Sequence, residues 1–90
     1  MILRQTFSEP IGGYWDGGKK SRFDWTINGP VQTDTKGDYV KVGSWEANHW
    51  FHVSLGKTTK QTLTNARRRL MSLARKAGKK CSFEYIEESK

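Results

Sequence analysis

Residues 58–80 read TTKQTLTNARRRLMSLARKAGKK, and this stretch decides the fold. Its apolar side chains recur mainly every three or four residues, which predicts one amphipathic helix over residues 59–77. The apolar stripe consists of Leu63, Ala66, Leu70, Leu73, Ala74 and Ala77. Thr58 and Gln61 match a capping box at the start of the helix, and Gly78 suits the position just past its end. We therefore expect one face of this helix to pack against the rest of the chain.

The sequence on both sides of the helix alternates between apolar and polar residues, which predicts β-strands with one buried face. The clearest runs are residues 21–28, 39–42, 49–55 and 81–86, and residues 2–8 are expected to add an edge strand. Residues 15–21 predict the tip of a hairpin, and the polar residues 30–38 predict a loop.

The predicted fold class is α+β, with a single domain over residues 1–90. A mostly antiparallel sheet of four to five strands is covered on one face by the helix, and a final strand follows at residues 81–86. Short links on both sides of the helix make the strand 49–55, the helix and the strand 81–86 a β-α-β unit.

The positive charge is concentrated in the helical segment. The chain has a net charge of +7, and residues 57–82 hold nine Lys or Arg with no Asp or Glu. Opposite the apolar stripe lie Arg68, Arg75 and Lys79, on one shoulder lie Asn65, Arg69 and Lys76, and on the other lie Lys60 and Arg67. A solubilising helix face usually mixes in Glu, which relieves repulsion between like charges four residues apart. The one-signed face predicts contact with a polyanion or an acidic surface, and a merely solvated face is the alternative.

Aromatic residues stand beside cations in the first predicted hairpin. Trp15 and Tyr14 are close in sequence to Lys19, Lys20 and Arg22. Cations engage phosphates while aromatic rings stack on bases or enter a groove, so this mixture suits nucleic acid. The alternative is that both rings pack in the core. Two further tryptophans, at positions 45 and 50, bracket a second predicted turn.

Several classes of function are disfavoured by the sequence. No window approaches the length of a membrane span, and the N-terminus lacks the apolar run of a signal peptide, so we expect a cytoplasmic protein without membrane contact. His49 and His52 are three residues apart on a predicted strand and should point to opposite faces, so no metal site or other cofactor is expected. No set of nucleophile, base and orienting group is visible, so we do not expect an enzyme.

Two resemblances accompany these patterns. Trp50-Phe51, residues 65–70 (NARRRL) and residues 74–80 (ARKAGKK) make the segment 50–86 similar to the C-terminal halves of small bacteriophage-encoded basic proteins, some of which bind DNA or inhibit host machinery. Residues 13–16 (GYWD) with 22–25 (RFDW) resemble the first hairpin of the three-strand-plus-helix DNA-binding domains of AP2 and of phage integrase arms. The second resemblance implies DNA readout by the sheet, whereas the charge of this chain lies on the helix.

The leading hypothesis from the sequence is a small, basic, non-enzymatic nucleic-acid-binding protein, with DNA favoured over RNA as the partner. The predicted phosphate contacts are Arg68, Arg75, Lys79, Arg69 and Lys76, extended by Lys19, Lys20 and Arg22, with Trp15 stacking on bases. The competing hypothesis is an interaction or inhibitor protein of phage type, which docks its basic helix and exposed aromatic residues on an acidic surface of a host protein or nucleoprotein complex. A homodimer through an exposed sheet edge is open in either case.

Overall fold

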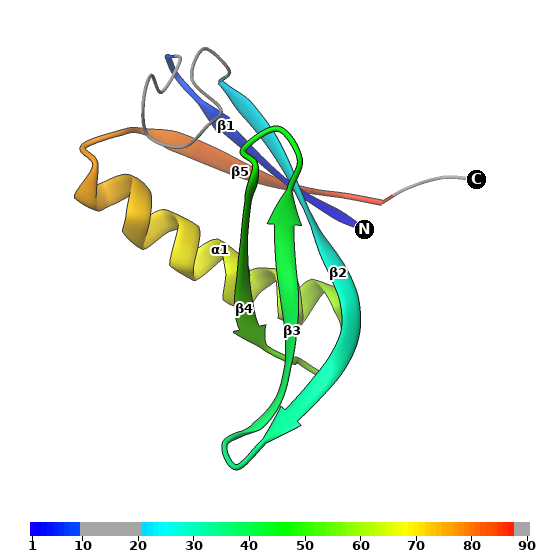
Figure 1. Cartoon of the computed structure of the whole chain (residues 1–90). Coiled ribbons are helices and arrows are strands. Elements are labelled where there is room, and N and C mark those ends of the chain that lie inside the picture. Colours follow the sequence, from blue (N-terminus) through cyan, green and yellow to red (C-terminus); the bar gives the residue numbers. More distant parts are fainter. Residues whose placement is uncertain (10–20, 88–90) are drawn as a thin grey trace.

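A computed structural model describes residues 1–9 and 21–87 of the chain. It contains five strands and one helix in the order β1 (Ile2–Phe7), β2 (Arg22–Asp34), β3 (Gly37–Ser44), β4 (His49–Ser54), α1 (Thr59–Lys76) and β5 (Cys81–Ile86). The strands form one antiparallel sheet in the spatial order β4-β3-β2-β1-β5, and α1 lies along one of its faces (Figure 1). The α+β prediction and the covering helix are thereby confirmed. The strands β4 and β5 that flank α1 in sequence run in the same direction at opposite edges of the sheet.

The long strand β2 joins the two halves of the sheet. Its first residues pair with β1, and its part from Thr26 to Asp34 pairs with β3. The register shifts between Asn28 and Gln32, where Gly29 has a positive φ of 80°. An irregularity of this kind bends a strand, and β2 curves accordingly in Figure 1.

The predicted loop at residues 30–38 is therefore wrong, because β2 continues to Asp34 and β3 begins at Gly37. Residues 29–38 are exposed on both faces of this hairpin. A strand without a buried face has no reason to alternate apolar with polar residues, so the sequence pattern gave no strand signal there.

Strand β1 lies inside the sheet, so the prediction that residues 2–8 form an edge strand is wrong. It lies between β2 and β5, with Leu3 paired to both Trp25 and Tyr85. Its residues Leu3, Gln5 and Phe7 are buried. The neighbour on its outer side is β5, whose paired residues are 74 to 84 positions away in sequence, so local patterning could not reveal it.

Both ends of α1 are fixed by local hydrogen bonds. The Thr58 side chain accepts a hydrogen bond from the Gln61 amide at 3.1 Å, and the Gln61 side chain accepts one from the Lys57 amide at 2.7 Å. At the other end Gly78 has a φ of 68°, and the amides of Gly78 and Lys79 donate to carbonyls of the last helical turn. This is a Schellman ending, which requires a residue that tolerates a positive φ.

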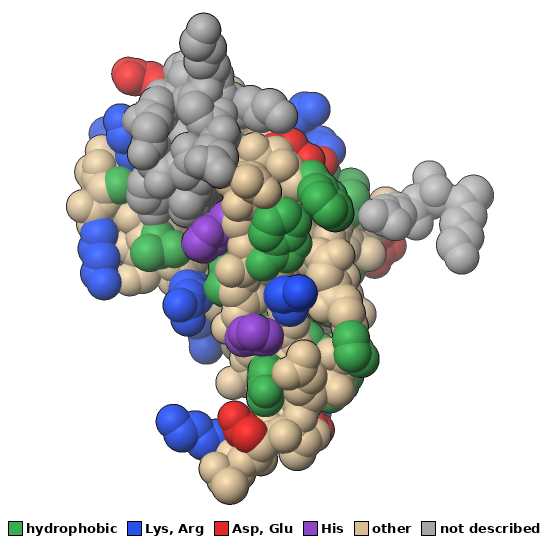
Figure 2. Space-filling view, in the orientation of Figure 1, with side chains coloured by type: hydrophobic (Ala, Val, Ile, Leu, Met, Phe, Trp, Pro, Cys, Tyr) green, Lys and Arg blue, Asp and Glu red, His purple; other side chains and the backbone are tan. Residues whose placement is uncertain are grey.

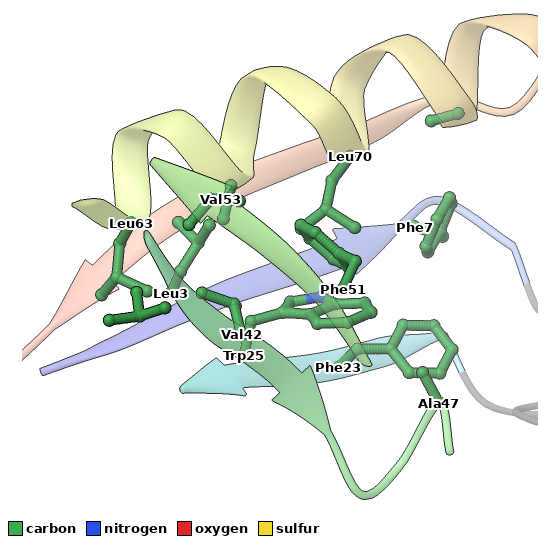
Figure 3. Packing of buried hydrophobic residues seen from close by; sticks show 13 residues of the cluster. Leu3, Phe7, Phe23, Trp25, Val42, Ala47, Phe51, Val53, Leu63 and Leu70 are labelled. Carbon is green, nitrogen blue, oxygen red and sulfur yellow. The ribbon is translucent and has the colours of Figure 1, made fainter. Parts of the chain in front are cut away.

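The core lies between α1 and the sheet (Figure 3). Leu63 and Leu70 from the helix, together with Ala66 and Ala74, are buried against side chains from β1 to β4. These include Leu3, Phe7, Phe23, Trp25, Val42, Phe51 and Val53. The two alanines have no side chain beyond Cβ, so they let the helix backbone come close to the sheet. Burial of these apolar side chains is the main term that holds the helix in place.

The amide side chain of Gln5 is buried within this core. Gln5 accepts a hydrogen bond from Trp25 Nε1 at 3.0 Å and donates one to Cys81 Sγ at 3.6 Å. Since a buried amide without partners is costly, these bonds let Gln5 occupy a core position and fix the orientation of the Trp25 ring.

Candidate nucleic-acid interface

The outward face of α1 carries exposed cations. Arg68 and Arg75 on the helix and Lys79 just after it are all exposed, as are Arg69 and Lys76. The described part of the chain places no carboxylate in an ion pair with any of these five side chains. Their charges are therefore available to a partner in solution.

The two shoulders of the helix contact opposite edges of the sheet. Toward β4, Asn65 donates from Nδ2 to the Ser54 carbonyl at 2.8 Å, and the Arg69 guanidinium lies 5.3 Å from the ring centre of Phe51. Toward β5, Lys60 and Arg67 both lie over the ring of Tyr85. These cation–π contacts orient the long side chains, whose stems cover apolar surface. Arg67 Nε is buried and has no hydrogen-bond partner among the described residues.

A shallow depression joins α1 to β4, and we call it the β4 depression. It is lined by His52, Val53, Ser54, Asn65, Arg68 and Arg69. A second depression beside β5 brings Arg75 and Lys79 together with Met71 and Phe83. The predicted cations of the helix are thus divided: Arg68 and Arg69 face the β4 side, and Arg75 and Lys79 lie toward the β5 side.

The other predicted site residues do not join this surface. Arg22 is exposed at the start of β2, where it pairs with Thr6. Because Phe23 points into the core, Arg22 points to the face of the sheet opposite α1, which we call the open face. Trp15, Lys19 and Lys20 lie outside the described residues, as does the predicted hairpin tip.

The open face carries an aromatic cluster, which we call the aromatic face: Tyr39, Trp45, Trp50 and His52, with Lys41 among them. Trp50 pairs with Gly43 across the β3–β4 ladder, and its indole ring lies over that glycine. Trp45 lies in the turn between β3 and β4 and meets Trp50 edge to face, with ring centres 5.2 Å apart. Tyr39 and His52 form a second edge-to-face pair at 5.3 Å. Trp45 remains 76% exposed, a large apolar surface left to solvent.

Hydrogen bonds fix the turn that carries Trp45. Glu46 accepts from the Asp24 amide at 2.8 Å, and Ser44 Oγ accepts from the Ala47 amide at 3.3 Å. Asn48 takes a positive φ of 49°, a conformation that asparagine tolerates better than most residues. The exposed tryptophan is therefore held on an ordered turn next to the sheet.

An ion pair neutralises one acidic residue on the open face. Arg4 donates two hydrogen bonds to the Asp24 carboxylate, at 2.8 and 3.1 Å. These bonds hold the pKa of Asp24 below its ordinary value. The repulsion that Asp24 would exert on an anionic ligand is reduced by this pairing.

The two histidines of β4 occupy different environments, and the prediction that they point to opposite faces is confirmed. His52 is exposed on the open face, whereas His49 contacts Trp25 and Phe51 at the rim of the core. Burial lowers the pKa of His49 below 6.5, and the nearby positive charge of Arg69 lowers it further.

Sequence reasoning found the helix cations and identified Trp45 and Trp50 as a pair around a turn, but it missed the aromatic face as a unit. The sequence did contain a signal for it, namely the alternation of side chains along β3 and β4. Tyr39, Lys41 and Gly43 alternate with buried valines in β3, and Trp50 and His52 alternate with buried Phe51 and Val53 in β4. Recognising the surface required the register that sets Gly43 opposite Trp50.

The view of Figure 2 takes in hydrophobic and histidine side chains over β3 and β4 and, past the β4 edge, Lys and Arg side chains over α1. Comparison with protein-family models, with curated proteins and with solved structures finds no match for this chain. No helix in the described ranges is long and apolar enough to cross a membrane. The chemistry of the two surfaces is therefore the guide to function.

Proposed function

We propose that this protein binds nucleic acid, with the exposed cations of α1 contacting backbone phosphates. The observation that carries this proposal is the outward face of the helix: Arg68, Arg75 and Lys79 are exposed, and no carboxylate of residues 57–82 accompanies them. Arg68 and Arg75 are seven positions apart on α1, which corresponds to roughly 10 Å along the helix and spans neighbouring phosphates, and Lys79 follows just after the helix end.

The helix carries these charges without a compensating acidic side chain. Residues 59–76 hold six Lys or Arg and no Asp or Glu. A polyanion that neutralises them gains counterion release on binding, so the unbalanced charge favours the complex.

The test compares two variants of equal net charge in fluorescence anisotropy titrations of labelled DNA and RNA. Arg68→Gln with Arg75→Gln removes two predicted phosphate contacts, and the control Lys36→Gln with Lys57→Gln removes two exposed cations that lie outside α1. The first variant should reduce the slope of log K against log salt by about 1.4 on single strands or about 1.8 on duplexes. The control should keep the slope of the unmodified protein. Equal slopes in both variants would show that α1 does not contact phosphates.

A second candidate function uses the same cations against an acidic protein surface. The 76% exposure of Trp45 favours it, because exposed tryptophans beside arginines are typical anchors of protein interfaces. Recovery of one acidic protein from a nuclease-treated extract, lost with Arg68→Gln and Arg75→Gln, would support this candidate. Support for this candidate also requires that the protein bind neither DNA nor RNA at about 50 mM salt.

A further inference from the structure

We infer that the aromatic face is a stacking platform for unpaired bases, and that the substrate of this protein is a single strand of nucleic acid. The inference rests on the proposed function and specifies its substrate. It is carried by a juxtaposition: exposed rings on the open face adjoin the α1 cations across a single strand, β4.

The rings are placed to receive a ligand. Trp50 lies over Gly43, where the absence of a side chain lets the indole approach the β3 backbone. Trp45 meets Trp50 edge to face and keeps 76% of its surface exposed. A tryptophan that contributed only to folding would gain more by burying this area, since burial of apolar surface is worth about 25 cal/mol per Å².

The second ring pair extends the platform along β3 and β4. Tyr39 and His52 meet 5.3 Å apart, and the exposed Lys41 pairs with His52 across the strands. His52 is exposed and Tyr39 is half-buried, and Lys41 places a cation beside them. Base stacking on aromatic rings flanked by cations is the recurring device of proteins that bind single strands.

The path from rings to cations passes over β4. His52 belongs to the aromatic face and also lines the β4 depression with Asn65, Arg68 and Arg69. A single nucleic-acid strand whose bases lie on the open face can therefore direct its phosphates into the β4 depression and onto α1. The cations attract the backbone. On the open face the carboxylate of Asp24 is paired with Arg4, which also lies close to Glu46 and Glu84.

A duplex does not fit these requirements. Its bases are paired and stacked on one another, so the faces of the bases are closed to Trp45 and Trp50 except at the ends. Stacking energy is gained only from unpaired bases, and phosphate contacts alone would not distinguish the two forms. The aromatic face thus predicts a preference for single strands.

At the Ser54 end of β4, hydrogen bonding of an additional β-strand to this sheet edge is disfavoured. The Ser54 carbonyl accepts a hydrogen bond from Asn65 Nδ2 at 2.8 Å, so this backbone acceptor is already occupied by α1. At this end of β4 the open face, rather than the edge, is the side available to a ligand.

The experiment uses the full chain with fluorescent oligo-dT, oligo-rU and a duplex of equal length at about 50 and 200 mM salt. Trp45→Ala removes an exposed ring and should leave the fold intact, and Val31→Ala is the matched control because Val31 is also exposed, at 52%, on β2. Loss of one stacking ring should weaken binding of single strands about 5- to 150-fold. The salt slope should stay unchanged because no phosphate contact is lost, and Trp45→Phe should restore part of the affinity.

The outcomes separate the inference from the proposed function. Preferential binding of oligo-dT or oligo-rU that is lost in Trp45→Ala supports the platform, and the two arms identify DNA or RNA as the preferred strand. Equal binding by Trp45→Ala and Val31→Ala, or tighter binding of the duplex, overturns the platform. In that case a salt slope that still depends on Arg68 and Arg75 leaves the proposed function standing. No binding of any of the three probes at about 50 mM salt overturns both.

Discussion

Replacement of Gly43 by alanine tests whether the Trp50 ring lies over β3 as described. A Cβ atom at position 43 would come within 2.5 Å of Trp50 Cγ and closer still to Cδ1 and Nε1, whereas ordinary contacts are 3.4–4 Å. The indole would have to move by at least about 1 Å or leave its position. Because Cγ is only one bond beyond Cβ, a small rotation about χ1 moves it little and cannot relieve the overlap.

The expected effect on stability combines two opposing terms. Overpacking of this kind costs about 1–3 kcal/mol. Positive φ angles occur at Gly29, Gly37 and Gly78 among the described glycines and not at Gly43, so alanine fits the backbone there. Reduced entropy of the unfolded chain should therefore return about 0.4–1 kcal/mol. We expect Gly43→Ala to lower the free energy of unfolding by about 1–2 kcal/mol.

Urea unfolding of a double-mutant cycle with Trp50→Leu provides the assay. In the Trp50→Leu background the aromatic ring is gone, and the smaller side chain can turn away from position 43. Gly43→Ala should then be neutral or stabilising, which corresponds to a coupling free energy of about 1–3 kcal/mol between positions 43 and 50. If Gly43→Ala stabilises the protein equally in both backgrounds, the Trp50 ring does not lie over Gly43, and the geometry of the aromatic face is wrong.

Three further predictions concern the core, the helix cap and pH. Leu70→Ala removes a fully buried side chain from the interface of α1 with the sheet and should cost about 2–5 kcal/mol in urea unfolding. Thr58→Ala removes the acceptor for the Gln61 amide and should cost about 1 kcal/mol, whereas Thr59→Ala should cost less. Burial lowers the pKa of His49, so the unfolded state takes up this proton first and stability should fall as pH drops below 6.5. The urea midpoint should decrease more between about pH 8 and pH 5 in the unmodified protein than in His49→Gln.

The helix was predictable from sequence to within one residue at its C-terminal end because its signals are local. The apolar stripe, the Thr58 cap and the positive-φ glycine at position 78 lie within 21 consecutive residues. Helical periodicity alone also predicted which polar and cationic side chains lie on each side of the apolar stripe. In the structure Arg69 faces Phe51 of β4, and Arg67 faces Tyr85 of β5.

The errors arose where the deciding contact is distant or where burial is absent. The sequence predicts β1 at an edge because its outer neighbour, β5, follows the helix in sequence. In the structure Phe7 of β1 pairs with Cys81 of β5. The hairpin at residues 29–38 was expected to be a loop because it extends beyond the core and buries neither face. The aromatic face depended on register, since only the pairing of Gly43 with Trp50 explains how the indole is accommodated.

Strand β4 connects the two proposed contact surfaces through the parity of its residues. Phe51 and Val53 point toward α1 and are buried, so their truncation should act on folding. Trp50 and His52 point to the open face, so their truncation should act mainly on a bound strand. Arg69 lies over Phe51 on the inner side, and His52 lines the β4 depression on the outer side. A six-residue edge strand can therefore hold the cationic helix on the sheet and at the same time present rings for bases, because alternate side chains of a strand face opposite sides.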